Sequence, residues 1–86
     1  MPNPKSLAFE HRSRPFELRV TGEGTLELYL DGIVRKQRAA GPVPQYVWTN
    51  VELEWEEHHY IEVRYWADPG KVRVTVNGEL LLEQAW

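Results

Sequence analysis

Val72-Arg73-Val74-Thr75-Val76-Asn77-Gly78 is the stretch of sequence that decides the fold. Its three valines alternate with polar residues, which is typical of a strand with one buried face, and Asn-Gly is a strong hairpin signal. A similar stretch, Leu26-Glu27-Leu28-Tyr29-Leu30-Asp31-Gly32, stands 46 residues earlier. The strands before them also match, because Phe16–Val20 and Ile61–Tyr65 are offset by 45 residues. The chain therefore contains an internal repeat, and a half that cannot bury its own apolar face is expected to pack on its copy.

This repeat predicts an all-β fold. We expect an antiparallel β-sandwich or flattened barrel of seven to nine short strands, built from two similar meanders. The 86 residues are expected to form one domain, residues 1–86. Residues 1–15 are expected to be partly irregular, with at most one short strand at Leu7–His11. Residues 39–45, which contain Gly41, Pro42 and Pro44, are expected to connect the two copies.

Two turn geometries are open at Asn77-Gly78. A two-residue loop places Leu80 on the face opposite the valines. A three-residue loop, with Gly78 in the left-handed position of a G1 bulge, pairs Val74 with Leu80 and keeps the apolar side chains on one face. The same choice arises at Asp31-Gly32. We predict the three-residue loop at both turns, because it unites the apolar residues.

Composition and charge narrow the class of protein. The absence of cysteine excludes a disulfide framework and a thiolate nucleophile. The net charge of −3 divides into +2 for residues 1–45 and −5 for residues 46–86. Because nucleic-acid affinity comes largely from phosphate neutralisation, the acidic second half argues against a nucleic-acid partner. No stretch approaches the roughly 18 apolar residues of a membrane span, and residues 1–5 lack the apolar region of a secretion signal. We expect a cytoplasmic protein with no membrane association and no cofactor.

The inventory of reactive side chains does not predict an enzyme. Ser6 and Ser13 are the only serines, and neither has the glycine-flanked elbow of a nucleophile. Glu52, Glu54 and Glu56 alternate with apolar residues, which predicts a solvated acidic face rather than an acid–base pair in a cleft.

His58 and His59 are the one pair that suggests a metal. Adjacent residues of a strand point to opposite faces, so these rings would converge only in a turn. No third ligand stands at a recognisable spacing. We predict that Glu57-His58-His59 is a turn without a metal, and a metal site there is the alternative.

Basic side chains could form one contact surface if the N-terminal strand lies beside the 33–38 strand. The alternative is that they protect an edge strand from pairing with other chains. The members of this basic group are Arg12, Arg14, Arg35, Lys36 and Arg38.

Aromatic side chains are the better functional candidates. Strand alternation directs some of them away from the core and leaves others without a place in any strand. Exposed tryptophan and tyrosine are enriched at recognition surfaces, and the alternative is that other parts of the chain cover them. This aromatic group consists of Tyr29, Trp48, Tyr60, Trp66 and Trp86.

Two functions fit these features. The first is a non-catalytic protein-interaction module, a small adaptor or inhibitor with a protein partner; a homodimer is also open. The acidic residues, with Arg64 as their nearest basic candidate, would favour a basic partner surface. The alternative is a carbohydrate- or small-ligand-binding β-sandwich with a tryptophan stacking platform. Such a site needs coplanar rings flanked by amide or carboxylate side chains, and Gln45 and Asn50 stand near Trp48.

The order of elements resembles the β-sandwich domain of the Fas apoptotic inhibitory molecule family. The matching pieces are Leu28–Gly32 followed by Arg35-Lys36, and Val72–Gly78 followed by Glu79-Leu80, within residues 16–84. The connection at Pro42-Val43-Pro44 departs from the family pattern. The resemblance implies a β-sandwich fold and a non-catalytic role exerted through protein contacts.

Overall fold

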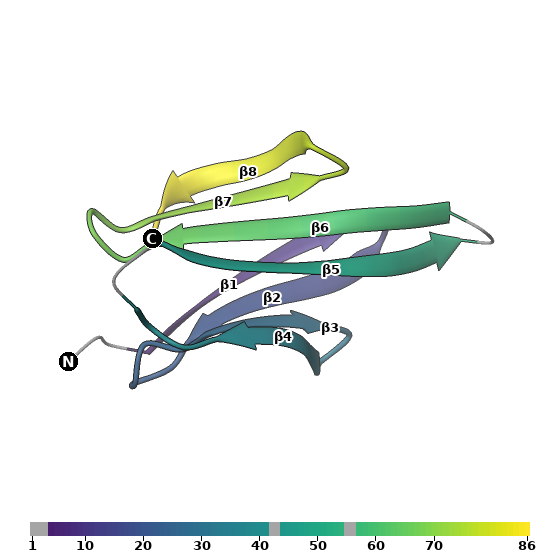
Figure 1. Cartoon of the computed structure of the whole chain (residues 1–86). Coiled ribbons are helices and arrows are strands. Elements are labelled where there is room, and N and C mark those ends of the chain that lie inside the picture. Colours follow the sequence, from purple (N-terminus) through teal and green to yellow (C-terminus); the bar gives the residue numbers. More distant parts are fainter. Residues whose placement is uncertain (1–3, 42–43, 55–56) are drawn as a thin grey trace. The chain divides into compact units, whose positions relative to one another are not determined.

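The structure, a computed structural model, describes residues 4–41, 44–54 and 57–86, and the side chains of these residues apart from 53, 54 and 57. Eight antiparallel strands make up most of this part of the chain (Figure 1). They form two four-stranded sheets in two compact units, Met1–Ala40 and Gly41–Trp86. The predicted all-β fold of two similar antiparallel meanders is confirmed. No helix in the described ranges is long and apolar enough to cross a membrane.

Each unit is a simple meander, in which every strand pairs with the next one along the chain. The first sheet contains β1 (Lys5–His11), β2 (Arg14–Val20), β3 (Leu26–Leu30) and β4 (Ile33–Arg38). The second contains β5 (Gln45–Glu54), β6 (Glu57–Trp66), β7 (Lys71–Val76) and β8 (Glu79–Ala85).

Two boundaries differ from the prediction. β1 begins at Lys5, so more of the N-terminal segment is regular than expected, because it pairs with β2 along its whole length. Glu57, His58 and His59 belong to β6 rather than to a turn. Glu57 pairs with Glu54 and His58 with Glu52, so these residues are part of the ladder between β5 and β6.

Alternation along the strands buries one face of each sheet. Phe16 pairs with Leu30 in the first sheet, as Ile61 pairs with Val76 in the second. Equivalent residues of the two copies thus pair in the same register. This register determines which side chains lie on the outward face of each sheet. The buried hydrophobic residues are Phe16, Leu18, Val20, Leu26, Leu28, Leu30, Val47, Val51, Ile61, Val63, Tyr65, Val72, Val74 and Val76.

The prediction of three-residue loops at the two Asx-Gly turns is wrong. Asp31 and Gly32 have φ values of 53° and 80°, and Asn77 and Gly78 have values of 50° and 82°. Positive φ at both central positions is the type I′ turn, whose twist matches that of the flanking strands. Asn and Asp tolerate this conformation because their short polar side chains can form local hydrogen bonds. The Asn77 side chain also bonds across to β6, where its Oδ1 accepts the backbone N–H of Tyr60 at 2.8 Å.

A bulge lies inside the strand that follows each of these turns. The register of the ladders makes Arg35 the extra residue in β4 and Leu81 the extra residue in β8, again 46 residues apart. The second bulge brings Leu82 opposite Val74 on the buried face, while Leu80 stays 60% exposed. The prediction that the leucines of β8 share the buried face of the valines is therefore correct for Leu82 and wrong for Leu80. A bulge within β8, and not a longer loop, places Leu82 on that face.

Candidate recognition surface

Trp48 on β5 and Tyr60 on β6 form an aromatic pair on the outward face of the second sheet. Their ring centroids are 6.5 Å apart, and the ring planes are tilted by 44°. The two residues are 47% and 49% exposed, more than any other aromatic residue whose side chain is described. Trp48 lies opposite Glu62 and Tyr60 lies opposite Asn50, so the two rings are diagonal neighbours across the ladder.

The backbone holds this pair in place. The N–H of Tyr60 donates to Oδ1 of Asn77, and the carbonyl of Tyr60 accepts the N–H of Asn77 at 2.9 Å. Trp48 lies in the interior of the ten-residue strand β5, paired along its length with β6. The two rings therefore project from paired strands rather than from loops.

Tyr46, Glu62 and Arg64 adjoin the aromatic pair on the same face. The pKa of Tyr46 is raised by burial first, then by the charge of Glu62 and a hydrogen bond to it, and the positive charge of Arg64 partly offsets this. The Arg64 guanidinium carbon lies 4.8 Å from the centroid of the Tyr46 ring. Tyr46 thus stays protonated at neutral pH and bridges a carboxylate and a cation.

This position corrects one expectation about the acidic residues. Arg64 lies opposite Tyr46, whereas Glu52 lies opposite His58 near the other end of the same ladder. Arg64 is therefore not the cross-strand neighbour of the acidic residues. Glu52 is exposed on the outward face. The side chain of Glu54, and Glu56 as a whole, lie outside the described residues.

Trp66 lies on the same sheet but is less accessible. The Lys71 Nζ is 5.6 Å and the Arg73 guanidinium carbon 5.4 Å from the centroid of its ring. Both cations are held by Glu83, whose carboxylate lies 3.0 Å from Lys71 and 2.7 Å from Arg73. The hydrogen bond from Lys71, followed by the hydrogen bond from Arg73, lowers the pKa of Glu83. Trp66 is thus part of a charged cluster rather than an open platform.

Trp86 does not share the outward face. Its ring meets that of Tyr65 edge-on, with centroids 5.4 Å apart and planes at 68°. Tyr65 is only 5% exposed, and the N–H of Trp86 donates to the carbonyl of Gly70 at 3.0 Å. Trp86 therefore packs at the margin of the buried face.

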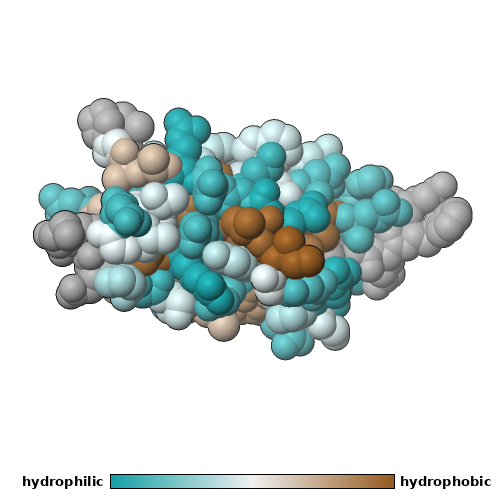
Figure 2. Space-filling model, turned by 90° about the horizontal axis from the view of Figure 1, so that it is seen from below, coloured by the Kyte–Doolittle hydropathy of each residue, from teal (hydrophilic) through white to brown (hydrophobic). Residues whose placement is uncertain are grey.

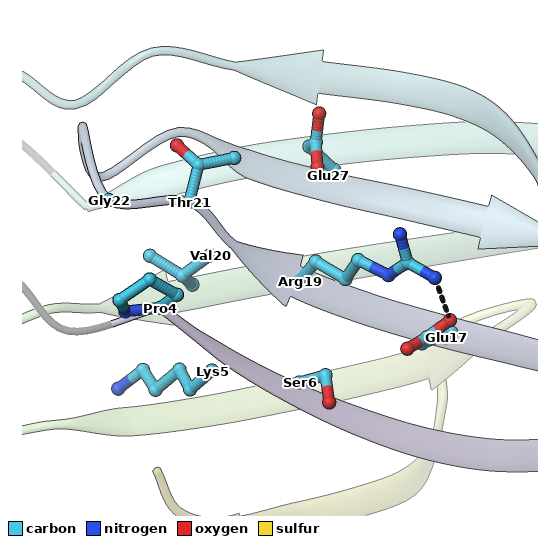
Figure 3. Close-up of a pocket in the computed structure, with 9 residues that line it drawn as sticks. All are labelled: Pro4, Lys5, Ser6, Glu17, Arg19, Val20, Thr21, Gly22 and Glu27. Carbon is cyan, nitrogen blue, oxygen red and sulfur yellow. Dashed lines mark hydrogen bonds and ion pairs between the residues drawn. The ribbon is translucent and has the colours of Figure 1, made fainter.

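Tyr29 belongs to the other unit, on the outward face of the first sheet. The Arg19 guanidinium carbon lies 4.3 Å from the centroid of its ring, and its hydroxyl donates to Glu27 at 3.2 Å. A shallow pocket of about 640 Å³ lies beside this group (Figure 3). Arg19 and Glu17, which both line the pocket, form an ion pair at 2.9 Å. The pocket residues are Pro4, Lys5, Ser6, Glu17, Arg19, Val20, Thr21, Gly22 and Glu27.

The basic group does not assemble as predicted. The prediction required β1 beside β4, but these strands are the two opposite edges of the first sheet. Arg12 lies in the turn after β1, and Arg14 makes an ion pair with Asp31. The remaining three lie on the exposed edge strand β4, where the edge-protection alternative expects charge: Arg35, Lys36 and Arg38.

The two histidines point to opposite faces of β6. His58 is exposed, and His59 is 4% exposed and lies opposite the buried Val51. Among the side chains that the structure describes, no three histidine or carboxylate groups gather as a metal site requires. The alternation rule gave the divergence of the two rings, but not the burial of His59.

Sequence reasoning did not find the exposed aliphatic residues. On the one face that Figure 2 shows, some hydrophobic side chains gather in a patch among hydrophilic ones. Each of the large aliphatic residues that are exposed follows an Asx-Gly turn on an edge strand, and that position is the signal that could have identified them. They are Ile33, Val34, Leu80 and Leu81.

Comparison with known proteins gives no relative for this chain. No protein-family model matches it, and no match was found among the curated proteins or the solved structures. The resemblance to the Fas apoptotic inhibitory molecule family therefore stays a prediction.

Proposed function

We propose that this chain is a non-catalytic protein-interaction module, a small adaptor or inhibitor that binds a protein partner around Trp48 and Tyr60. The observation that carries the proposal is the half-exposed aromatic pair on adjacent strands of the second sheet. Tryptophan and tyrosine bury a large area with few rotatable bonds, so they dominate the energetic centre of protein interfaces.

The surroundings of the pair also suit a protein partner. Polar and charged groups, among them Asn50, Glu52 and Glu62, lie on the same face as the two rings. An apolar centre with a polar rim is the usual anatomy of a protein interface. Truncation of a central aromatic residue commonly costs at least about 2 kcal/mol of binding, which is roughly a thirtyfold loss of affinity.

The carbohydrate-binding alternative draws on one observation, that Asn50 lies opposite Tyr60 and so places an amide beside the rings. The ring geometry favours it less, because planes tilted by 44° do not form one flat platform. Trp66 and Trp86 contribute no further ring to this surface, since they pack against Lys71 and Tyr65 respectively.

The test is affinity capture from the native lysate with three immobilised proteins. We expect wild type to retain a specific protein, and Trp48→Ala/Tyr60→Ala to lose it. Tyr29→Ala is the matched control, because it removes an outward aromatic ring from the other sheet. Equal recovery by the double variant would contradict the proposal. Loss of glycan-array binding in Trp48→Ala, with no protein captured by wild type, would favour the carbohydrate alternative.

A further inference from the structure

The four edge strands of the two sheets are not protected equally. β4, β5 and β8 each carry a register shift in the ladder with their neighbour. β1 pairs with β2 residue by residue from Lys5 to His11, without a shift. Bulges twist an edge away from incoming strands, so their absence leaves β1 the most regular edge in the described part of the chain.

The outward backbone groups of β1 follow from one hydrogen bond on its neighbour. The carbonyl of Pro15 in β2 accepts the N–H of Asp31, so it points toward β3. Backbone groups alternate between the two sides of a strand. Phe16, the next residue in β2, therefore bonds to its partner Phe9 in β1. The residues of β1 between such bonded positions direct their N–H and C=O groups away from β2: Ser6, Ala8 and Glu10.

We propose that β1 pairs antiparallel with β1 of a second copy of this chain, with Ala8 opposite Ala8 at the two-fold axis. In this register Ser6 faces Glu10 of the second copy, and Leu7 faces Phe9. The three outward-directed positions form hydrogen-bonded pairs that exchange two bonds each. The first sheets of the two copies, β1–β4 of each, then become one continuous sheet.

The side chains favour this register over its neighbours. It pairs every residue of β1, whereas moving the axis to Leu7 or Phe9 leaves two residues of each strand unpaired. Leu7 and Phe9 are only half-buried in the edge strand. In the dimer, Leu7 of each copy lies against Phe9 of the other, so both side chains become more buried. The Ser6 hydroxyl can donate to the Glu10 carboxylate across the interface, and no like charges are opposed at these positions.

The length of the edge sets the strength of the dimer. A seven-residue strand pair buries less than the roughly 1,600 Å² of a standard stable interface, so the association is weak and reversible. This inference does not rest on the proposed function, because it uses the other sheet. Trp48→Ala/Tyr60→Ala is expected to dimerise as wild type does.

Sedimentation velocity from about 1 μM to about 1 mM tests the dimer, in the range where interfaces of this kind form. We expect the apparent mass to rise from 10.1 kDa toward twice that value. Ser6→Glu places carboxylates opposite each other at both symmetric positions, and two such repulsions are expected to weaken dimerisation about tenfold at low salt. Ser6→Glu/Glu10→Lys turns both into attractive pairs and should restore it.

Gln37→Glu is the matched control, because it adds the same charge on the opposite edge strand β4 and should leave dimerisation unchanged. All the substituted positions are exposed, and circular dichroism checks that each variant folds. A mass of one chain at every concentration would overturn the proposal. Dimerisation of Ser6→Glu at wild-type strength, or no recovery in the double variant, would overturn the register centred on Ala8.

Discussion

The turn at Asn77-Gly78 yields the sharpest stability prediction, because one residue combines two separable contributions. Asn77 holds a left-handed backbone with φ of 50°, and its side chain accepts the N–H of Tyr60 at 2.8 Å. Asn77→Gly removes the hydrogen bond and keeps the left-handed backbone free of strain. Asn77→Ala also removes the hydrogen bond, and alanine lacks the short polar side chain with which asparagine tolerates the left-handed conformation.

The magnitudes follow from these two contributions. A net hydrogen bond contributes about 0.5–1.5 kcal/mol, and the lower part of this range applies because water can reach the Tyr60 N–H. The left-handed conformation costs an alanine a further 1–2 kcal/mol, roughly. We expect losses in the free energy of unfolding of about 0.5–1 kcal/mol for Asn77→Gly and about 2 kcal/mol for Asn77→Ala. In a domain of this size, each kcal/mol lowers Tm by about 4–8 °C.

Urea unfolding followed by tryptophan fluorescence measures the two values. Asp31, at the equivalent position of the first sheet with φ of 53°, supplies the matched pair Asp31→Gly and Asp31→Ala. The alanine variant should again be the less stable by about 1 kcal/mol, since the backbone is the same. If Asn77→Ala equals or exceeds Asn77→Gly in stability, the type I′ turn is refuted. A three-residue loop would place Asn77 in the right-handed region, where alanine is better than glycine.

Three further predictions concern the core, a charged cluster and the acidic face. Leu28 is fully buried, so Leu28→Ala should lower the free energy of unfolding by about 2–5 kcal/mol in the same urea assay. Glu83 has a pKa below its usual 4.5 because Lys71 and Arg73 donate to it, so its contribution to stability is present above that value and is lost as pH falls through the lowered pKa. Lys71→Met/Arg73→Met should move this pKa upward in an NMR titration, and an unchanged pKa would contradict the assignment. Glu52→Lys should slow association with a basic partner and flatten its salt dependence, measured by surface plasmon resonance with the captured protein.

The overall architecture could be predicted from the sequence, because alternation acts on every residue of a strand. Leu26, Leu28 and Leu30 alternate with Glu27 and Tyr29, the pattern that predicts one buried face, and all three leucines are buried. The offset of the repeat recurs in the register of the structure, since Val20 and Leu26 pair as Tyr65 and Val72 do. Such patterns are redundant, and a single misleading residue does not alter them.

The details that failed depend on single residues or on pairing between distant strands. The type I′ turn and the bulge at Leu81 together place Leu82 inside and Leu80 outside, and no periodicity distinguishes this from a longer loop. The basic group required the order of strands in the sheet, which alternation does not contain. Exposure of Trp48 rather than Trp66 depends on Lys71 and Arg73, which reach back across the turn to the Trp66 ring.

The two meanders share a framework and differ where side chains face outward. By register, Trp48 occupies the place that Ala8 occupies in the first sheet, because they lie opposite Glu62 and Glu17, which are 45 residues apart.

Tyr60 likewise stands where the first sheet has Pro15. The buried positions of β2 and β3 are apolar, and so are their equivalents in β6 and β7 from Ile61 to Val76, because packing constrains them. The outward positions are free of that constraint, so one copy can carry a large aromatic pair and the other a small residue on a regular edge. Ala8 lies at the centre of the proposed strand pair, and the large Trp48 presents area to a partner. The proposed recognition surface and the proposed dimer edge thus arise at equivalent positions of one duplicated sheet.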